Sequence, residues 1–232
     1  MGENLLVPSI DQRLGALIEV SRRVNLEETP KIKRPKWAVT ISREFGCEGY
    51  PAAEELQKML EKRTGEPWAL VDRGLIDEVA KRNDLEAGIF HNLGKRPRWL
   101  DDMFSSLSTK WKNERDYFQL LARHIVSLAS GGNVIIVGMG GAIVTQSMKN
   151  CLHFRIFGSM EFKTASIARR AKVTDAEAIE MIEKRQKARE KFVRDFLDRD
   201  INNPDYYNII FNNSKSSAQQ IARTIDAFMA AS

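Results

Sequence analysis

Short runs of uninterrupted apolar residues alternate with segments of helical periodicity through most of this 232-residue chain. The runs VIIV at 134–137 and IIF at 209–211 contain no polar residue, which is typical of strands buried on both faces of a sheet. Strands that alternate with helices favour an α/β fold, a parallel sheet covered by helices. Strands are predicted at 38–42, 68–72, 133–138, 152–158 and 207–212, and helices at 51–63, 75–82, 113–130, 142–148, 161–172, 175–198 and 216–229.

The composition is that of a globular protein, because 43% hydrophobic residues suffice for a full core. The net charge of +5 and the pI near 9.2 suit anionic partners such as nucleotides or nucleic acid, although many proteins carry a similar excess. The only cysteines, Cys47 and Cys151, lie far apart, which argues against a disulfide framework. No apolar run approaches a membrane span, and the first residues lack a signal-peptide core. We therefore expect a soluble, cytoplasmic protein without a membrane partner.

Residues 1–35 are predicted to form a helical extension ahead of a main domain at 36–232. Apolar residues recur at helical spacing from Ile10 to Val24, and the polar stretch 25–36, with two prolines, is typical of a linker. This helix either packs on the domain or contacts a partner, including a second copy of the chain. Residues 86–108 have no clear periodicity and are predicted to form an irregular insertion or flap.

The segment 37–60 predicts a strand, a tight loop and a helix, the local arrangement that places a phosphate at a helix N-terminus. Gly46 and Gly49 permit a tight turn, and Pro51 suits the first turn of a helix. A Walker loop, GxxxxGK[ST], also needs a lysine and a hydroxyl. When the loop is aligned by its last glycine (Gly49), Tyr50 and Pro51 replace the lysine and the hydroxyl residue. When it is aligned one residue earlier, Gly49 replaces the lysine. The loop is therefore either a phosphate site or a structural turn.

Each lost charge-assisted contact costs on the order of 1.5–3 kcal/mol. Arg43, at the end of the preceding strand, is a candidate substitute cation, whereas Glu48 adds a carboxylate close to any bound phosphate. Both features bear on whether the loop still supports chemistry.

Other chemistries find little support in the sequence. His91, His124 and His153 have no metal-ligand spacing, so no metal site is predicted. Cys47 lies at a predicted helix N-terminus, which can lower the pKa of a thiol, although a lone loop cysteine is more often inert. Aromatic and basic residues between 95 and 118 suit base stacking, but no recognised module accompanies them, so nucleic-acid binding is not expected.

An ordered set of motifs runs along the chain: TISREFGCEGYP, ALVDRGLIDEVAKR, NVIIVGMGGAIV, LHFRIFGSMEFKTASIARR, KRQKAREKF and DYYNIIFNNSK. Over about 37–229 this set resembles the cytidylate-kinase-like family, a branch of the P-loop nucleoside monophosphate kinases. The resemblance implies a three-layer α/β P-loop fold with a five-stranded parallel sheet in the order 2-3-1-4-5. It also implies a helical lid at about 161–200.

The resemblance assigns roles to residues at the ends of the strands and in the lid. Arg43, Arg185 and Arg189 correspond to catalytic cations, the last two lying four apart on one face of a helix. Without the resemblance, the sequence of that helix favours a solvated charged face. Residues that would bind the nucleotide cofactor are Gly46, Cys47, Glu48, Gly49, Tyr50, Arg169, Arg170 and Asn213, and those that would bind the acceptor are Asp72, Arg73, Gly138 and Gly140.

Two functional hypotheses follow from the resemblance. The first is a phosphotransferase that moves the γ-phosphoryl group of ATP to CMP or a related acceptor, with Mg2+ held by waters and by Glu44. The second is a catalytically impaired nucleotide-binding sensor or interaction protein. It is favoured by four departures at chemical positions: Tyr50, Pro51, Met139 where relatives carry an arginine, and Gln186 where they carry an aspartate.

Overall fold

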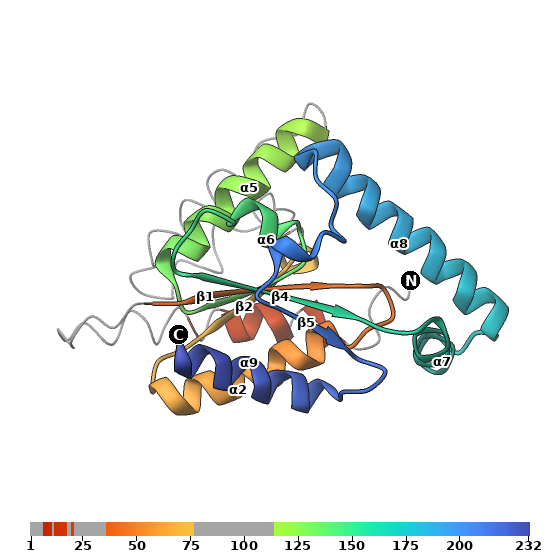
Figure 1. Ribbon diagram of the computed structural model, residues 1–232, viewed down its shortest axis with the longest axis horizontal. Helices are drawn as coiled ribbons and strands as arrows, with labels where there is room; N and C mark the ends of the chain where they lie inside the picture. The colour runs from red at the N-terminus through yellow and green to blue at the C-terminus, as the bar shows by residue number, and fades with distance from the viewer. Residues whose placement is uncertain (1–6, 11, 18–19, 21–35, 77–113) are drawn as a thin grey trace.

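The computed structural model describes residues 7–10, 12–17, 20, 36–76 and 114–232. Within them, five strands form one parallel sheet in the order β2–β3–β1–β4–β5, which confirms the predicted fold class and strand order (Figure 1). The central strand β1 pairs with both neighbours, so Ala38 lies opposite Val134 on one side and Cys151 on the other. The strands are β1 (Ala38–Arg43), β2 (Ala69–Asp72), β3 (Val134–Val137), β4 (Cys151–Phe157) and β5 (Ile209–Asn212).

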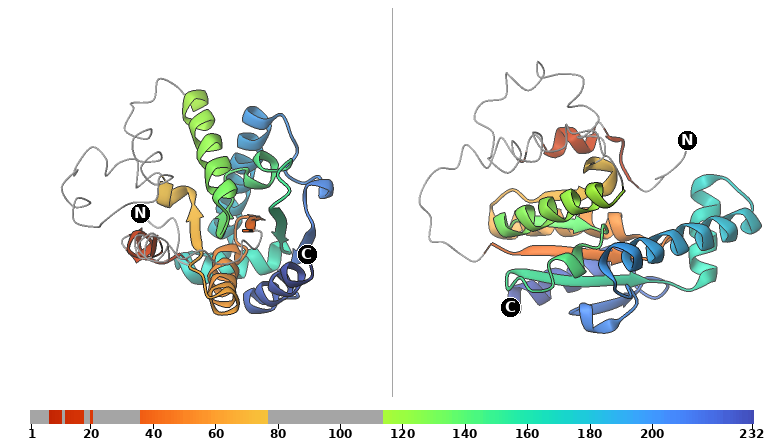
Figure 2. Two further views of the ribbon diagram at one scale, coloured as in Figure 1. Left: turned by 90° about the vertical axis from the view of Figure 1, so that its left-hand side faces the viewer. Right: turned by 90° about the horizontal axis from the view of Figure 1, so that it is seen from above.

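Helices cover both faces of the sheet, as the buried apolar strands require. Two helices, α2 (Gly49–Thr64) and α9 (Ala218–Ala231), pack side by side on one face, and α5 (Glu114–Gly131) and the short α6 (Gly141–Val144) lie on the other (Figures 1 and 2). Beyond the carboxyl end of β4 lies α7 (Met160–Ala171), and α8 (Asp175–Leu197) turns back from it toward the sheet. The pair α7–α8 occupies the stretch predicted to form the lid.

Side-chain caps set where the late helices begin. A capping box of Thr174 and Glu177 is present at the start of α8. The N-cap of α9 is Ser217, whose hydroxyl accepts from the Gln220 amide. The nearby Ser214 has another partner, because its hydroxyl accepts from the amide of Ser159 at 2.7 Å.

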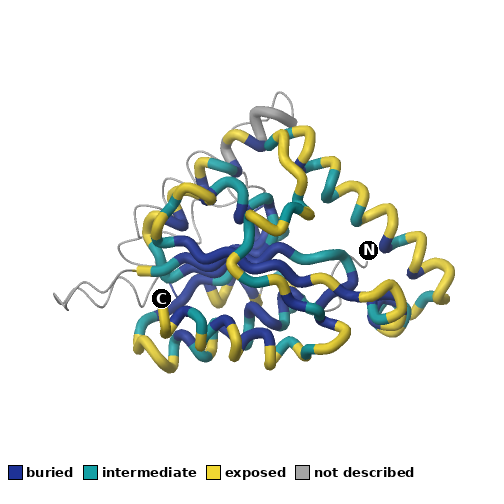
Figure 3. Tube along the Cα trace, viewed as in Figure 1, coloured by how far each residue is buried: buried dark blue, intermediate teal, exposed yellow. Residues whose placement is uncertain are grey.

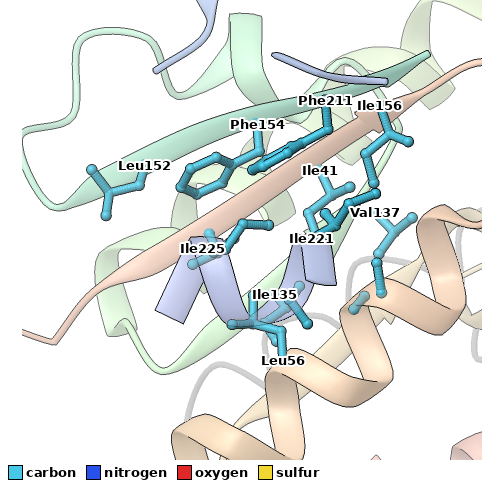
Figure 4. Close-up of a cluster of buried hydrophobic side chains, with 14 of the residues drawn as sticks. Ile41, Leu56, Ile135, Val137, Leu152, Phe154, Ile156, Phe211, Ile221 and Ile225 are labelled. Carbon is cyan, nitrogen blue, oxygen red and sulfur yellow. The ribbon is translucent and has the colours of Figure 1, made fainter. Parts of the chain in front are cut away.

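The sheet separates two hydrophobic clusters (Figure 3). Beneath it, Phe154 and Phe211 of the strands meet Leu56 of α2 and Ile221 of α9 (Figure 4). Burying a side chain of this size is worth about 1.5–3 kcal/mol. The opposite cluster joins strand residues to the helices on the upper face: Val71, Leu75, Leu121, Ile125, Ile136 and the N-terminal residues Leu14, Leu17 and Val20.

The described part of the N-terminal segment packs on the domain. Residues 10, 12–17 and 20 are helical; of the apolar side chains that predicted this helix, Leu14 and Leu17 are buried in the upper cluster and Ile10 packs against it. The linker at 25–35, most of the helix expected at 75–82, the insertion at 86–108 and His91 lie outside the described residues. The domain boundary at residue 36 therefore stays a prediction. Among the helices that the structure describes, none is long and apolar enough to cross a membrane.

Candidate active site

A cavity of about 500 Å³ opens where β1, β2 and β3 end, the edge at which open parallel sheets hold their ligands. The turn 138–141 forms one wall, and one face of α8 forms another. Four arginines line it: Arg43, Arg73, Arg185 and Arg189. We call it the arginine cavity. Asp72 is the one acidic residue among the described lining residues.

Arg43 lies between the first loop and the turn after β3. A Cβ atom built on Gly138 would lie 1.9 Å from Arg43 Nη1, so only glycine leaves room for this guanidinium. The φ of Gly138, 82°, also favours glycine. Burial lowers the pKa of Arg43 from its ordinary value, and the nearby Asp72 carboxylate opposes that shift.

Arg189 reaches the same place from α8. Its Nη1 donates to the backbone oxygen of Arg43 at 3.2 Å, and its guanidinium lies 5.3 Å from the centre of the Phe45 ring. Burial lowers the pKa of Arg189 well below its ordinary value, and repulsion from Arg43 adds to the shift. Because arginine stays protonated in proteins, this shift marks a buried guanidinium close to another positive charge, and an incoming anion would stabilise it.

Arg185 and Arg73 complete the ring of cations. Arg185 lies one helical turn before Arg189, which places both on one face of α8 as the sequence predicted. Arg73 follows β2, and its guanidinium lies 5.7 Å from the centre of the Phe192 ring. The predicted acceptor residues Asp72, Gly138 and Gly140 also line the cavity. The structure thus brings together seven residues that the sequence singled out, four arginines, one aspartate and two glycines.

The loop Gly46–Tyr50, with Phe45 directly before it, forms a second region, in which several polar groups have partners inside the protein. The Phe45 amide donates to Gln186 Oε1 at 3.2 Å, and the Glu48 amide donates to Asn213 Oδ1 at 2.7 Å. The Glu48 carboxylate pairs with Arg170 at 3.1 Å. The side chain of Asn213 also donates to the backbone oxygen of Ser216 at 2.9 Å. Asn213 therefore links the loop to the turn after β5.

Helix α7 lies directly against the loop. A Cβ on Gly46 would lie 2.8 Å from Lys163 Cβ, and the Ser166 hydroxyl donates to the backbone oxygen of Gly46 at 3.0 Å. Gly46 has a φ of 96°, so the turn needs glycine for two reasons. Arg169, the predicted companion of Arg170, is exposed, whereas Arg170 is partly buried; neither arginine lines the cavity.

Tyr50 and Cys47 carry no charge in this loop. Burial raises the pKa of Tyr50, so its phenol stays protonated and cannot act as a negative or positive group. Burial, followed by the Glu44 carboxylate, raises the pKa of Cys47 to about 12. Of the two readings of Cys47, the raised pKa favours the inert loop cysteine, because burial outweighs the helix terminus.

The described residues do not fit a protein-held Mg2+. Glu44, the candidate metal contact in the sequence, pairs with Lys163 Nζ at 2.7 Å and accepts from the Gly158 amide at 3.4 Å. Pro51 has no hydroxyl to offer. Among the described residues no cluster of His, Cys, Asp or Glu is suited to a metal ion. His153 is buried, and its Nδ1 lies within hydrogen-bond distance, 2.8 Å, of Thr40 Oγ1.

Two contributors were not predicted from the sequence. Arg13 pairs with Asp72, and both side chains are buried. The aromatic rings of Phe45, Phe192 and Tyr207 line the cavity. Arg13 lies one helical turn before the apolar Leu17, and a charge beside an apolar stripe was the only signal for it in the sequence.

A parallel sheet with a strand–loop–helix at its centre and a cationic cavity at its carboxyl edge defines a P-loop kinase-like α/β protein. The match to the family model described as "Cytidylate kinase-like family" covers residues 38–215, and the chain belongs to that family. The match begins after the N-terminal helix and ends before α9. No curated protein matches the sequence.

Solved structures share the fold at low sequence identity. An uncharacterized protein from Eubacterium ventriosum ATCC 27560 superposes with a TM-score of 0.61 at 20% identity, covering 85% of this chain and 99% of that one. A shikimate kinase from Bacteroides thetaiotaomicron gives a TM-score of 0.44 at 13% identity, covering 84% and 98%. A gluconokinase from Sinorhizobium meliloti 1021 gives 0.42 at 11%, covering 86% and 99%. At these identities the likeness concerns the fold alone.

Proposed function

We propose that this protein is a phosphotransferase that moves the γ-phosphoryl group of ATP to CMP or a related nucleoside monophosphate. In this reaction a phosphate oxygen of the acceptor bonds to the γ-phosphorus, the bond from that phosphorus to the bridging oxygen breaks, and ADP leaves. The observation that carries the proposal is the convergence of four arginines on one cavity at the carboxyl edge of the sheet. Membership of a kinase-like family supports the same reaction class. Such an enzyme would work in the cytoplasm.

The arginine cavity would hold the acceptor phosphate and the transferring group. Arg185 and Arg189 project from one face of α8, where two guanidiniums can share the charge of a phosphoryl group. Phosphoryl transfer is catalysed mainly by positioning and charge neutralisation, so a cluster of arginines without a general base is sufficient chemistry. Arg73 and the turn 138–141 would contact the acceptor.

The donor phosphates would lie at the loop Gly46–Tyr50, with Arg170 and Asn213 beside it. There the side chains of Gln186 and Asn213 accept hydrogen bonds from two loop amides. These are neutral hydrogen bonds, worth about 0.5–1.5 kcal/mol each, whereas bonds to a charged phosphate are worth about 1.5–3 kcal/mol. A triphosphate can therefore displace both side chains. Mg2+ would enter with the nucleotide, because the described residues include no group of three or more His, Cys, Asp or Glu side chains suited to hold it.

A coupled assay of ADP formation tests the proposal, with ATP, Mg2+ and a panel of CMP, dCMP, UMP and AMP. We expect turnover with at least one pyrimidine monophosphate, and its loss in Arg189→Met. The matched control is Arg194→Met, because Arg194 is exposed on the same helix and outside the cavity lining. Absence of turnover with every acceptor would contradict the proposal.

The second candidate is a nucleotide-binding protein of the same family without turnover. The specific observation in its favour is the loop, where amides have internal partners and a neutral Tyr50 replaces the lysine. A thermal-shift and calorimetry panel separates the two candidates, since a ligand that binds the native state raises the melting temperature. Binding of ATP or CMP without turnover would favour this second candidate.

A further inference from the structure

Arg13 contacts a residue of the arginine cavity, Asp72, from outside the part of the chain that matches the family. The family match begins at residue 38, whereas Arg13 lies in the N-terminal helical segment. Its guanidinium forms an ion pair with Asp72, the acid at the end of β2. Asp72 lines the cavity, so the N-terminal segment supplies a partner to a residue of the site.

The pair is buried and held in place. The side chains of Arg13 and Asp72 are only 6% and 7% exposed. The same Asp72 oxygen accepts from the Leu75 amide at 2.9 Å, which fixes the carboxylate at the start of the helical turn 73–76. The guanidinium also lies 5.8 Å from the centre of the Tyr50 ring.

Apolar contacts fix the backbone that carries Arg13. Leu14, Leu17 and Val20 are buried in one cluster with Val71 and Leu75, the residues that flank Asp72. The cluster therefore fixes both partners of the ion pair. A surface ion pair contributes little, but removing one partner of a buried pair leaves an uncompensated charge and is strongly unfavourable.

The charge of Asp72 matters because of what shares its cavity. A bare carboxylate there would attract the Arg43 guanidinium, whose pKa already responds to Asp72, and would repel a phosphorylated ligand. The ion pair with Arg13, which lies outside the cavity lining, offsets the charge of this carboxylate. Arg43 and Arg189 then face the ligand beside a carboxylate whose charge is largely offset.

We propose that Arg13 is a positioning residue of the arginine cavity: it holds the Asp72 carboxylate and cancels its charge, so that the cavity accepts a phosphorylated anion. The inference rests on the proposed function only for the class of ligand. Its consequence is that the segment ahead of the family domain is part of the site.

The test is calorimetric titration of the full chain with inorganic pyrophosphate, a probe that needs neither ATP nor transfer. Arg13→Met should weaken binding about tenfold, because the bare Asp72 charge then opposes the anion. Arg13→Met combined with Asp72→Asn should recover most of that loss, since no bare charge remains. Asp72→Asn alone should bind at least as tightly as the wild type, and this variant serves if Arg13→Met fails to fold.

Thermal unfolding of the same variants separates this role from a merely structural one. A structural role would lower the melting temperature of Arg13→Met and leave the pyrophosphate affinity of the folded protein unchanged, which would overturn the inference. So would failure of the double variant to recover, weaker binding by Asp72→Asn, or a wild type that does not bind pyrophosphate. Arg63→Met, at the distant ion pair with Asp226, is the matched control and should bind normally. Absence of transfer in the ADP assay would contradict the proposed function. The pyrophosphate affinities would still test the role of Arg13, because they do not depend on transfer.

Discussion

The loop Gly46–Tyr50 and the arginine cavity both begin where β1 ends, yet they differ in how far their polar and charged groups are paired within the protein. In the loop, two amides donate to neutral side chains and the Glu48 carboxylate pairs with Arg170. In the cavity, four arginines face one aspartate, and that aspartate already has Arg13 as its partner. A loop of familiar outline can thus have internal partners, whereas the described lining of the adjoining cavity holds four arginines and one acid. Affinity for phosphate should therefore lie mainly in the cavity.

The largest expected effect concerns Arg189 in the cavity. Arg189→Met should weaken CMP binding on the order of 100-fold, about 3 kcal/mol, because a charged hydrogen-bond donor to phosphate is lost. Isothermal titration calorimetry measures this affinity, with Arg194→Met as the control. Because Arg189 also donates to the Arg43 carbonyl, Arg189→Lys is the second variant, and it should retain part of the binding. Unchanged affinity in Arg189→Met would contradict the claim that the arginine cavity binds the phosphate of CMP.

A pH test addresses the sheet on which both regions depend. Burial lowers the pKa of His153 in β4 to about 4, from an ordinary 6.5. The unfolded chain therefore binds the extra proton first as pH falls, so stability is full above about 6.5 and is lost toward pH 4. Between pH 7 and pH 5 the free energy of unfolding should fall by about 2 kcal/mol from this residue.

Urea unfolding at the two pH values measures that loss. His153→Gln, which cannot gain a proton, should lose this part of the pH dependence. The same slope in the variant and the wild type would show that the burial of His153 is not its cause.

A smaller effect is expected in the loop. Gln186→Ala removes the acceptor of the Phe45 amide, and should lower the free energy of unfolding by about 1 kcal/mol. It should also leave ATP affinity unchanged or tighter, because a competitor for the loop amide is gone. Chemical denaturation and calorimetry check the two results, with the exposed neighbour variant Lys187→Ala as control. A marked loss of ATP affinity would instead make Gln186 a direct ligand of the nucleotide.

The smallest expected effect is at Cys47. With a pKa raised to about 12 and only 7% exposure, its thiol should not react with iodoacetamide at pH 8 while the protein is folded. Mass spectrometry of the labelled peptide reads the result, and labelling after unfolding in urea is the positive control. Rapid labelling of the native protein would mean that the loop is open.

Local sequence rules predicted the elements well, and long-range contacts explain where they failed. The buried apolar runs predicted the strands, and the resemblance supplied the strand order. β5 begins at Ile209 rather than residue 207, because a short helical turn, Pro204–Tyr206, precedes it and the Tyr207 hydroxyl donates to Ile201 O at 2.7 Å. No local pattern contains that contact.

In the candidate site, too, local spacing could be predicted from the sequence, whereas long-range pairings could not. The spacing of Arg185 and Arg189 places them on one face, because the helical repeat fixes it. The partners of the loop amides, Gln186 and Asn213, lie 141 and 165 residues away from them in sequence. Arg13 likewise meets Asp72 across 59 residues. Such pairings depend on tertiary packing, which neither propensity nor periodicity encodes.

The most direct test of where phosphate binds is an NMR titration of the isotope-labelled protein with CMP, following backbone amides and arginine Nε–H groups. We predict shifts at Gly138, Gly140 and the Arg189 side chain, with the amides of Gly46 and Gly49 nearly unmoved. Shifts confined to Gly46 and Gly49, with the arginine signals unchanged, would contradict the account.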